Sequence, residues 1–453
     1  MASDRPKGPA FDERDTIPYY LPGTAVRERV MPSVVSAQPI PAILGGQPEV
    51  QLEQDQANRW PIITEEEEQA VLAVLRSGQW SIHDEVTALE ADYRQWLGIQ
   101  YALAHCNGTS AILAALHAFE IEPGDEVIVP SATYWASVTP VLHLGCIPVF
   151  AETEAQCLGL DPDDVQAKIT QRTKAIVIVH LFGMPSRMDE LLDIAHRHGL
   201  KVLEDASHAH GATYHGKPIG TLGDAAVFSM QTNKLCPAGE GGMLVTNNAA
   251  LWEKALLLGH YERVIDLDTP NRRFAATGFG LKLRMSPLNA AVARVQLRHL
   301  PERNRRRTEN IVYLSQRLEA LGIETFLSPP EVERVYFEYL VRYDQNQTGL
   351  PITDLVAALR AEGVLVDRAR YPLLHQQPLF TEGHWARIAR RSATDQCPLP
   401  TYDPQALPRT EATNGMVLKL PSFPSASTAL LDQYAAAFAK VLAHADQIPR
   451  EQT

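Results

Sequence analysis

The chain has 453 residues, enough for two domains or for one large domain with a smaller one beside it. Its formal net charge of -13 argues against nucleic acid as the main partner, and the sequence contains no run of about 18 apolar residues that would suggest a membrane span. The charged first residues lack the apolar stretch of a secretory signal, and the five cysteines are scattered without a C-x-x-C pair, so we expect a reduced protein of the cytoplasm.

The predicted elements begin after an irregular N-terminal arm. Residues 1–45 contain seven of the 32 prolines and no periodic pattern, which is typical of a segment without regular structure. Thr64 followed by Glu67 has the spacing of a capping box, and Gly78 is placed to end the helix that follows. We take residues 46–295 as a large domain that contains this helix.

Strand and helix patterns alternate through the large domain. The expected helices span residues 109–120 and 187–199. The expected strands span residues 125–133, 147–152, 173–183, 200–207, 224–230 and 241–248. Continuous Val, Ile and Leu runs between helices are typical of a sheet that is buried on both faces. We therefore expect an α/β fold with a mostly parallel central sheet and helices on both of its faces.

The pattern changes beyond the last expected strand. Residues 287–322 carry an apolar stripe and a charged face, which predicts one long helix or two helices in series. The basic run Glu302–Asn310 could indicate a nucleic-acid surface, but we interpret it as the solvated face of this helix. A strand pattern follows at residues 335–344 and a helix pattern at residues 353–363. We expect residues 296–453 to form a smaller C-terminal α+β domain.

Four stretches of the large domain end strands or begin helices, and ligands of doubly wound sheets collect outside the carboxyl ends of the strands. The first carries Gly108, Thr109 and Ser110 at the start of a helix. Free N–H groups and hydroxyls there suit a phosphate, and a plain N-cap is the alternative. The second places Tyr134 and Trp135 after a strand. One ring could stack on a flat ligand while the other packs in the core, because neighbouring strand residues point to opposite faces.

The third stretch has Asp205 at the end of an apolar strand, where a carboxylate is costly unless it is paired. A protonated ring nitrogen would pair it. His208 lies three residues further on and could touch the same ligand. Together with His210 and His215 it could instead hold a metal ion, but their spacing matches no zinc pattern carried by a helix, so we expect no metal.

The fourth stretch joins Ser229, at the end of a strand, to Lys234 before a glycine-rich turn. Ser229 could be a second phosphate ligand. A lone lysine in a loop is usually solvated, but a lysine that is partly desolvated beside a carbonyl forms a Schiff base. Glycines let the backbone pass close to a ligand. The four stretches together describe a ligand with a phosphate, a flat ring, a basic ring nitrogen and an aldehyde, which is pyridoxal 5′-phosphate (PLP).

The order of these stretches resembles that of the DegT/StrS sugar aminotransferases, a group within the fold type I PLP-dependent transferases. The resemblance covers residues 58–445. It rests on six motifs, which are Asn107–Leu113, Pro130–Ser137, His180–Leu191, Glu204–Ala212, Phe228–Gly242 and Gly280–Leu297. The resemblance implies that the large domain binds PLP.

The resemblance also implies a role for each candidate residue. Lys234 carries the internal aldimine and moves a proton between cofactor and substrate carbons, and Asp205 pairs with the pyridine nitrogen. His208 contacts the phenolic oxygen of the ring. Tyr134 is the stacking aromatic, and Trp135 faces away. The phosphate ligands are Thr109, Ser229 and the N–H groups of Gly108 and Ser110.

Lys282 departs from the family pattern. It stands where the family often has an asparagine that reaches the phosphate of a neighbouring subunit, and it could make that contact as a point charge. A lysine at this place resembles the branch that acts on keto-cyclitols such as scyllo-inosose. In the smaller domain, Tyr371 and His375 belong to a segment that resembles the family's loop over the site. They are candidate substrate contacts, with an ordinary turn as the alternative.

The sequence thus predicts a PLP-dependent aminotransferase. It would move an amino group from L-glutamate or L-glutamine to a keto-sugar, often nucleotide-linked, or to a keto-cyclitol, through the Lys234 aldimine and pyridoxamine phosphate. The resemblance implies a homodimer whose sites are shared between subunits. Three alternatives stay open: a PLP-dependent sugar dehydratase of the same fold, a non-catalytic binding protein of that fold, and a metal hydrolase built on the three histidines. Lys234 argues against the dehydratase, because the known dehydratase branches carry histidine at its position.

Overall fold

The computed structural model describes residues 39–82, 84–326, 328–391 and 399–450. Residues 1–38, most of the predicted arm, lie outside this description. The first long helix, α2 (Glu65–Ser77), begins at Thr64 with the predicted capping box, in which the Thr64 N–H donates to Glu67 Oε2 at 2.8 Å. Gly78 ends the helix in the left-handed region, with a φ of 73°. Both helix signals in the sequence are confirmed.

A seven-stranded sheet with the order β1-β9-β8-β5-β4-β2-β3 forms the centre of the larger part of the structure. Its strands are β1 (Tyr101–His105), β2 (Glu126–Pro130), β3 (Ile147–Ala151), β4 (Thr173–Val179), β5 (Lys201–Asp205), β8 (Ala225–Ser229) and β9 (Gly242–Thr246). Neighbours from β8 to β3 pair in parallel, whereas β9 runs antiparallel to both β8 and β1. The predicted mostly parallel sheet is confirmed, with a strand in each of the six predicted ranges.

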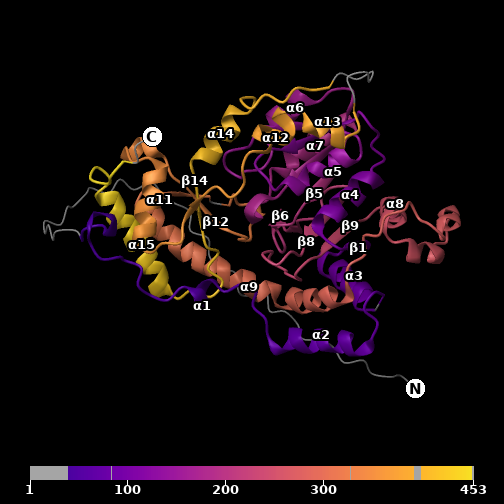
Figure 1. The fold of residues 1–453 in the computed structure, drawn as a ribbon, viewed down its shortest axis with the longest axis horizontal. Helices are drawn as coiled ribbons and strands as arrows, with labels where there is room; N and C mark the ends of the chain where they lie inside the picture. Colours follow the sequence, from indigo (N-terminus) through magenta and orange to yellow (C-terminus); the bar gives the residue numbers. More distant parts are fainter. Residues whose placement is uncertain (1–38, 83, 327, 392–398, 451–453) are drawn as a thin grey trace. The chain divides into compact units, whose positions relative to one another are not determined.

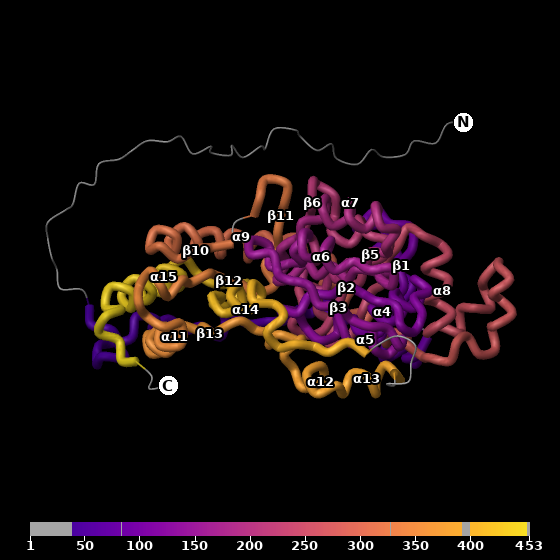
Figure 2. The backbone as a smooth tube through the Cα atoms, turned by 90° about the horizontal axis from the view of Figure 1, so that it is seen from above, coloured from indigo at the N-terminus to yellow at the C-terminus, as the bar shows by residue number. Residues whose placement is uncertain are grey.

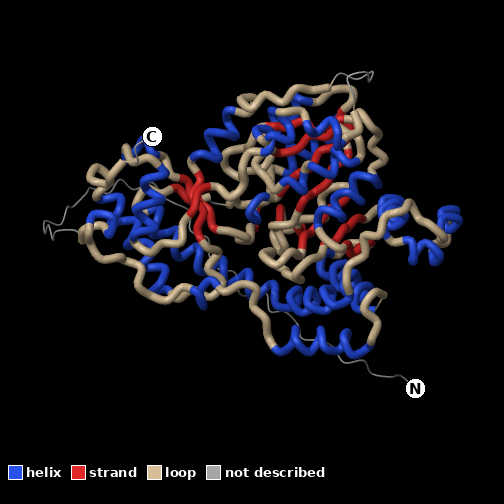
Figure 3. The backbone as a smooth tube through the Cα atoms, in the orientation of Figure 1, coloured by secondary structure: helices blue, strands red, loops and turns tan. Residues whose placement is uncertain are grey.

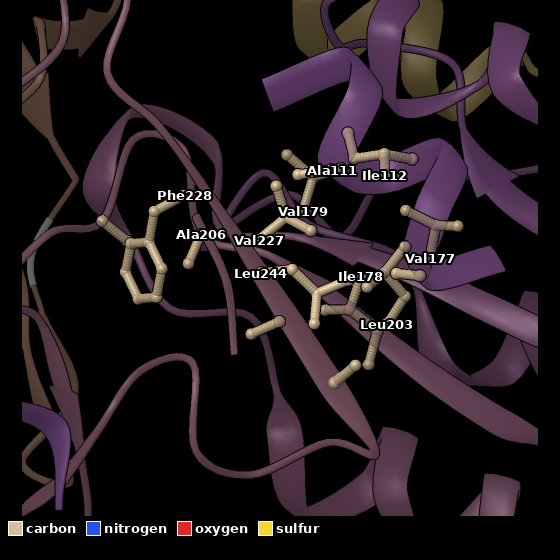
Figure 4. Packing of buried hydrophobic residues seen from close by; sticks show 14 of the residues in the cluster. Ala111, Ile112, Val177, Ile178, Val179, Leu203, Ala206, Val227, Phe228 and Leu244 are labelled. Carbon is tan, nitrogen blue, oxygen red and sulfur yellow. The ribbon is translucent and has the colours of Figure 1, made fainter. Parts of the chain in front are cut away.

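Helices flank this sheet on both sides (Figures 1 and 3). They include α3 (Asp84–Leu97), α4 (Gly108–Ala118), α5 (Thr139–His143), α6 (Pro162–Lys168), α7 (Met188–His198) and α8 (Ala249–Gly259). Figure 4 shows Ile178 of β4 and Leu203 of β5 in the resulting core, with Ile112 of α4 above them. Each such buried side chain contributes roughly 1.5–3 kcal/mol, which explains the continuous apolar runs of the strands.

A second apolar cluster surrounds a four-stranded antiparallel sheet with the order β10-β12-β14-β13. Figure 2 shows the backbone of this region, with β12 and β13 close to α11 and α15. Its strands are β10 (Glu324–Thr325), β12 (Tyr339–Arg342), β13 (Asp367–Arg368) and β14 (Val417–Leu420). Three helices supply the rest of the cluster, namely α9 (Pro287–Glu319), α11 (Ile352–Ala361) and α15 (Thr428–Ala443). Val50 and Ala57 belong to the same cluster. The division of the chain at residues 295 and 296 stays our proposal, since α9 runs continuously across it.

The remaining elements are short. They are η1 (Ala42–Leu44), α1 (Asp55–Asn58), η2 (Trp135–Ser137), η3 (Leu181–Gly183), β6 (Thr213–Tyr214), β7 (Lys217–Pro218), η4 (Tyr261–Asp266), η5 (Pro270–Phe274), β11 (Val332–Glu333), α10 (Gln345–Thr348), η6 (Leu374–Gln376), α12 (Pro378–Thr381), α13 (His384–Ile388) and α14 (Pro408–Gly415). Strands β11, β6 and β7 form a small third sheet. Among the residues that the structure describes, no helix is both long and apolar enough to cross a membrane.

The long helix α9 corrects one interpretation of the sequence. It is a single helix that contains Pro301, and its basic run is not uniformly solvated. Arg305 and Arg306 are exposed and pair with glutamates of the same helix, as expected. Arg303 and Arg307 are buried instead, with exposed fractions of 8% and 2%. Residues four apart share one face of a helix, and this face of α9 points into the protein.

Candidate functional site

A cavity of about 460 Å³ opens where the carboxyl ends of β4, β5 and β8 meet the N-terminus of α4. Seven of the nine predicted cofactor residues line it, and they are Gly108, Thr109, Tyr134, Asp205, His208, Ser229 and Lys234. This is the edge of a parallel sheet at which ligands collect in doubly wound folds.

The first turn of α4 lies directly against the end of β8. A Cβ atom built on Gly108 would lie 2.9 Å from Cβ of Ser229, so only glycine fits this approach. Asn107 caps the helix by accepting hydrogen bonds from the Ser110 N–H at 2.8 Å and from the Ser110 hydroxyl at 2.7 Å. The donors of Ser110 are therefore used within the helix, and Ser110 is not among the residues that line the cavity.

Asp205 stands at the end of β5 with an exposed fraction of 5%. Its Oδ2 accepts a hydrogen bond from the Ser137 hydroxyl at 2.7 Å, and its Oδ1 accepts one from the Ser207 N–H at 3.1 Å. These bonds orient the carboxylate at the cavity wall and offset part of the cost of burying it.

His208 is held as a neutral ring. Its Nδ1 accepts a hydrogen bond from the Phe182 N–H at 3.2 Å, so its proton lies on Nε2, which is 3.3 Å from the Tyr371 hydroxyl. The ring stacks on Phe337 with a centroid distance of 4.1 Å. Burial, with the positive charges of Lys234 and Arg370 adding to it, holds the pKa of His208 well below its ordinary value of 6.5.

Lys234 lies in the loop between β8 and β9. Burial, with the charge of Arg370 adding to it and the carboxylates of Asp205 and Glu338 opposing it, lowers the pKa of its amine from 10.5 to about 8. Its Nζ lies 4.7 Å from the centre of the Phe337 ring. An amine with this pKa is partly neutral at physiological pH, as a nucleophilic lysine must be.

Two exposed aromatic rings form another side of the cavity, and they correct a prediction. Tyr134 and Trp135 both line it, with their ring centroids 4.8 Å apart. The expected opposite directions apply to neighbours in a strand, but β2 ends at Pro130 and Trp135 begins the helical turn η2. The expectation that Trp135 faces away from the site is therefore wrong.

Comparison with known proteins gives the same assignment as this geometry. A sequence profile of the DegT/DnrJ/EryC1/StrS aminotransferase family matches residues 61–438. The chain belongs to this family. PLP is the cofactor of these enzymes, and the predicted family, fold type and enzyme class are confirmed.

The relatives of this aminotransferase carry names that refer to different compounds. The chain is 34% identical over 410 residues to an L-glutamine:scyllo-inosose aminotransferase of Streptomyces griseus, which covers 86% of this chain and 96% of the relative. It is 38% identical over 327 residues to a GDP-perosamine synthase of Caulobacter vibrioides, covering 70% and 85%. Among solved structures, an aminotransferase of Psychrobacter cryohalolentis superposes with a TM-score of 0.76 at 28% identity, covering 86% of this chain and 99% of that one.

The cavity of this aminotransferase fits PLP on the geometry of its own residues. The close approach at Gly108 brings the N–H groups of α4 beside the Ser229 hydroxyl, a donor set suited to a phosphate. The buried carboxylate of Asp205 suits a protonated ring nitrogen, and the partly neutral Lys234 suits an aldehyde. The role of each residue toward the cofactor is taken up as a proposal below.

Other predicted residues lie outside the cavity. Lys282 is exposed and is not part of the cavity wall. Of the two residues in the C-terminal loop, Tyr371 lines the cavity. His375 does not, because its Nδ1 is 2.7 Å from the Ser131 hydroxyl and its Nε2 is 3.1 Å from the Pro404 carbonyl. The candidate contact at His375 is therefore an internal link of the fold.

The three histidines of the metal alternative are not gathered at one point. His210 Nε2 lies 3.1 Å from the Tyr93 hydroxyl in the core, whereas exposed His215 pairs with Asp189 at 2.9 Å. His208 is bound to Phe182 and Tyr371 as described above. Within the described part of the chain, no group of three or more His, Cys, Asp or Glu side chains could hold a metal ion.

Three residues of the site were missed in the sequence. Ser137 orients Asp205 and lies inside the motif Pro130–Ser137, but its type alone gave no sign of this contact. Phe337 and Arg370 come from the C-terminal half and enter the cavity through tertiary packing. An arginine and an aromatic residue in loops carry no signal of their own, so only the folded chain identifies them.

Proposed function

We propose that this aminotransferase moves an amino group from L-glutamine or L-glutamate to a keto-cyclitol or a keto-sugar, using PLP held in the cavity of Lys234. The observation that carries the proposal is the lowered pKa of Lys234, about 8, in a cavity that also contains the buried carboxylate of Asp205. A structural lysine has no need of a neutral amine, and a catalytic one does.

We propose a task for each of the main residues of the cavity. Gly108, Thr109 and Ser229 bind the phosphate of PLP at the mouth of α4, which fixes the reacting carbon in place. Asp205 keeps the ring nitrogen protonated, and Ser137 keeps Asp205 in position. When bound, PLP supplies an electrophilic carbonyl and a ring that accepts electrons.

Lys234 has the second task of moving a proton. Released from the cofactor by the amino donor, its Nζ is the base that takes a proton from the substrate carbon and returns it to a neighbouring atom. A pKa near the working pH suits both directions of that transfer. His208, neutral and stacked on Phe337, positions the ring oxygen through its Nε2 proton or through Tyr371.

The donor and acceptor classes rest on the relatives. The relative from Streptomyces griseus is named for L-glutamine and scyllo-inosose, and the resemblance at Lys282 favours the same branch, so L-glutamine and a keto-cyclitol are our first choice. The relative from Caulobacter vibrioides is named for GDP-perosamine and favours a nucleotide-linked keto-sugar as the second candidate. The paired half-reactions proposed in the next subsection separate the two acceptors.

We propose that a second copy of the chain completes the site. We also propose that the protein acts in the cytoplasm. Lys282 lies outside the cavity of its own chain and is exposed, so a partner's cavity is a place where it could meet a phosphate. Tyr134 and Trp135, each close to 45% exposed, would be covered by the same contact. Measuring the molar mass in solution with and without PLP tests this arrangement, and a monomer that turns over substrate would refute it.

The test of the function is an absorbance spectrum of the purified protein before and after addition of L-glutamine or L-glutamate. A yellow band that disappears with one of the donors supports the proposal, and Lys234→Ala should abolish the band and turnover while the protein stays folded. A protein that stays colourless with added PLP would favour a non-catalytic binding protein. A yellow protein whose band no amino donor alters, but which eliminates water from a deoxy sugar, would favour the dehydratase.

A further inference from the structure

A second cavity, of about 640 Å³, adjoins the cavity of Lys234. Asn233, Phe337 and Arg370 line both of them. The remaining wall comes from Trp60 before α2, from Arg307 on α9 and from the second sheet around β13 and β14. A ligand that reaches Lys234 thus has a further space beside it, and the same three residues contribute to the walls of both cavities.

Basic side chains outnumber acidic ones in this second cavity. The basic ones are Arg307, Arg360, Arg370 and Lys419, and the acidic ones are Glu338 and Asp367. Arg370 pairs with Glu338. Arg360 and Lys419 both pair with Asp367, Lys419 at 3.1 Å. Both carboxylates are therefore engaged by other cations, and the positive charge of Arg307 is left over.

Arg307 is buried, and none of the described residues pairs with it as an anion. It is 2% exposed, and its Nε and Nη1 atoms have no hydrogen-bond partner within the described residues. Its guanidinium carbon lies 3.9 Å from the centre of the Trp60 ring, which gives it a cation–π contact. Burial lowers the pKa of Arg307 to about 9, so it still carries its charge at neutral pH. A cation–π contact recovers only a part of the cost of burying a cation, and an anion would recover more.

Trp60 connects this arginine to the catalytic lysine. The indole N–H of Trp60 donates a hydrogen bond to the Lys234 carbonyl at 3.0 Å. The ring of the same side chain lies under the guanidinium of Arg307. A group that binds to Arg307 therefore lies one side chain away from the backbone of Lys234. The unpaired charge therefore lies close to the loop that carries Lys234 and not at a remote point of the fold.

We propose that the second cavity is an anion subsite, in which Arg307 binds a carboxylate or phosphate group of a substrate whose reacting end lies in the cavity of Lys234. The proposal rests on the proposed function, because it requires a substrate at Lys234. The planar guanidinium suits either oxyanion. A carboxylate would belong to the amino-acid donor, and a phosphate would belong to a nucleotide-linked acceptor, so the two sources are separated by the half-reaction in which they act.

The test uses the PLP-loaded full chain with Arg307→Met, Arg307→Lys and the control Arg334→Met. Arg334 also lies over an aromatic ring, that of Tyr336, but lines neither cavity. The donor half-reaction is followed by absorbance with L-glutamine and L-glutamate, and the acceptor half-reaction with a keto-cyclitol and a nucleotide-linked keto-sugar. We expect Arg307→Met to raise the half-saturating concentration of one substrate about tenfold or more, and Arg307→Lys to reverse part of this rise. Arg334→Met should leave the half-saturating concentrations of both half-reactions unchanged. An effect confined to the donors assigns a carboxylate, and one confined to the nucleotide-linked acceptor assigns a phosphate.

Two readouts separate this role from a structural one and from failure of the proposed function. Replacing an unpaired buried charge with an apolar side chain should leave the melting temperature equal or raise it, so Arg307→Met is expected to melt no earlier than the parent protein.

Calorimetric titration of the cofactor-free chain with L-glutamine and with inorganic pyrophosphate should show binding of one of them that Arg307→Met removes. A colourless protein would refute the aminotransferase and would leave this binding measurable. Unchanged half-saturation in both half-reactions, together with unchanged anion binding, would overturn the subsite.

Discussion

Lys234 is expected to react with an aldehyde at neutral pH much faster than an ordinary lysine does. Burial lowers its pKa from 10.5 to about 8. At pH 7 a lysine with a pKa of 8 is neutral in roughly one molecule in ten, and a lysine with a pKa of 10.5 in roughly one in 3,000. Only the neutral amine attacks a carbonyl, so capture of PLP should be about 300-fold faster at equal intrinsic reactivity.

Arg370 offers a way to perturb this pKa without touching the lysine. Its positive charge lowers the pKa of Lys234, and it pairs with Glu338, whose negative charge raises the pKa of Lys234. Arg370→Met removes the first effect and frees the second, so both changes move the pKa of Lys234 upward. Capture of PLP at pH 7 should slow accordingly. Lys254→Met is the control and should change nothing, because Lys254 on α8 pairs with Glu120 and lies outside the cavity of Lys234.

The assay mixes the cofactor-free full chain with PLP at a series of values between about pH 6 and pH 10 and follows the yellow band over time. The rate should rise about tenfold per pH unit and level off near pH 8, because the neutral fraction does so. In Arg370→Met the plateau should begin at a higher pH. A rate in the parent protein that keeps rising toward pH 10 would refute the lowered pKa of Lys234. An unchanged inflection in the variant would refute the assigned cause.

Three further predictions concern stability. Because the folded pKa of Lys234 lies below the unfolded value of 10.5, the unfolded chain binds more protons between pH 8 and 10.5, and the free energy of unfolding of the cofactor-free protein should rise over that window by about 3 kcal/mol at most. Urea unfolding at both ends of the window measures this, and Lys234→Met should remove the dependence. Gly108→Ala should lower the melting temperature, since its Cβ would lie 2.9 Å from Cβ of Ser229, and the added change Ser229→Gly should restore it; no rescue would contradict the proposed clash. Lys440→Met leaves the fully buried Glu362 carboxylate without the ammonium group 2.9 Å away, and should cost about 3–5 kcal/mol in denaturant unfolding, whereas a loss under about 1 kcal/mol would contradict an ion pair that matters.

The fold and the centre of the site were readable in the sequence because both depend on local constraints. Continuous apolar runs between helices identify a buried parallel sheet whatever the rest of the chain does. Position 108 must be glycine because the start of α4 lies directly against Ser229. Lys234 lies in the loop that follows β8, five residues after Ser229. These residues lie at one edge of the sheet, and each follows a strand or begins a helix. Their positions along the chain are therefore enough to predict that they lie together.

Residues whose direction depends on one local turn were less readable. Ser110 has the hydroxyl and N–H of a phosphate ligand, but Asn107 takes both for the helix cap. Trp135 was given the opposite direction to Tyr134, as in a strand, although the strand had ended five residues earlier, at Pro130. In both cases the residue type was informative and the backbone conformation decided its use.

Phe337 and Arg370, which enter the site from the C-terminal half of the chain, gave no signal in the sequence. Phe337 contacts His208 and Lys234, and Arg370 influences the pKa of both, yet they stand in a region with short elements and no motif of chemistry. Of the pair Tyr371 and His375, only tertiary packing decides that Tyr371 reaches the cavity. Substrate choice depends on such residues, which is why the enzyme class is more accessible from sequence than the acceptor is.

The basic run of α9 shows most clearly that composition alone does not decide how a residue is used. Taken by composition it is one charged surface, but a helix of 3.6 residues per turn divides it, with Arg303 and Arg307 on one face and Arg305 and Arg306 on another. Arg303 has polar partners at Gln296 and at the Ile62 carbonyl, whereas among the described residues the contact found for Arg307 is the Trp60 ring. A buried cation that lacks an anion destabilises the fold, and an apolar residue at its place would pack at less cost. An arginine is therefore expected at this position only if something that binds beside it needs the charge, and the cavity shared with Lys234 is where that group would lie.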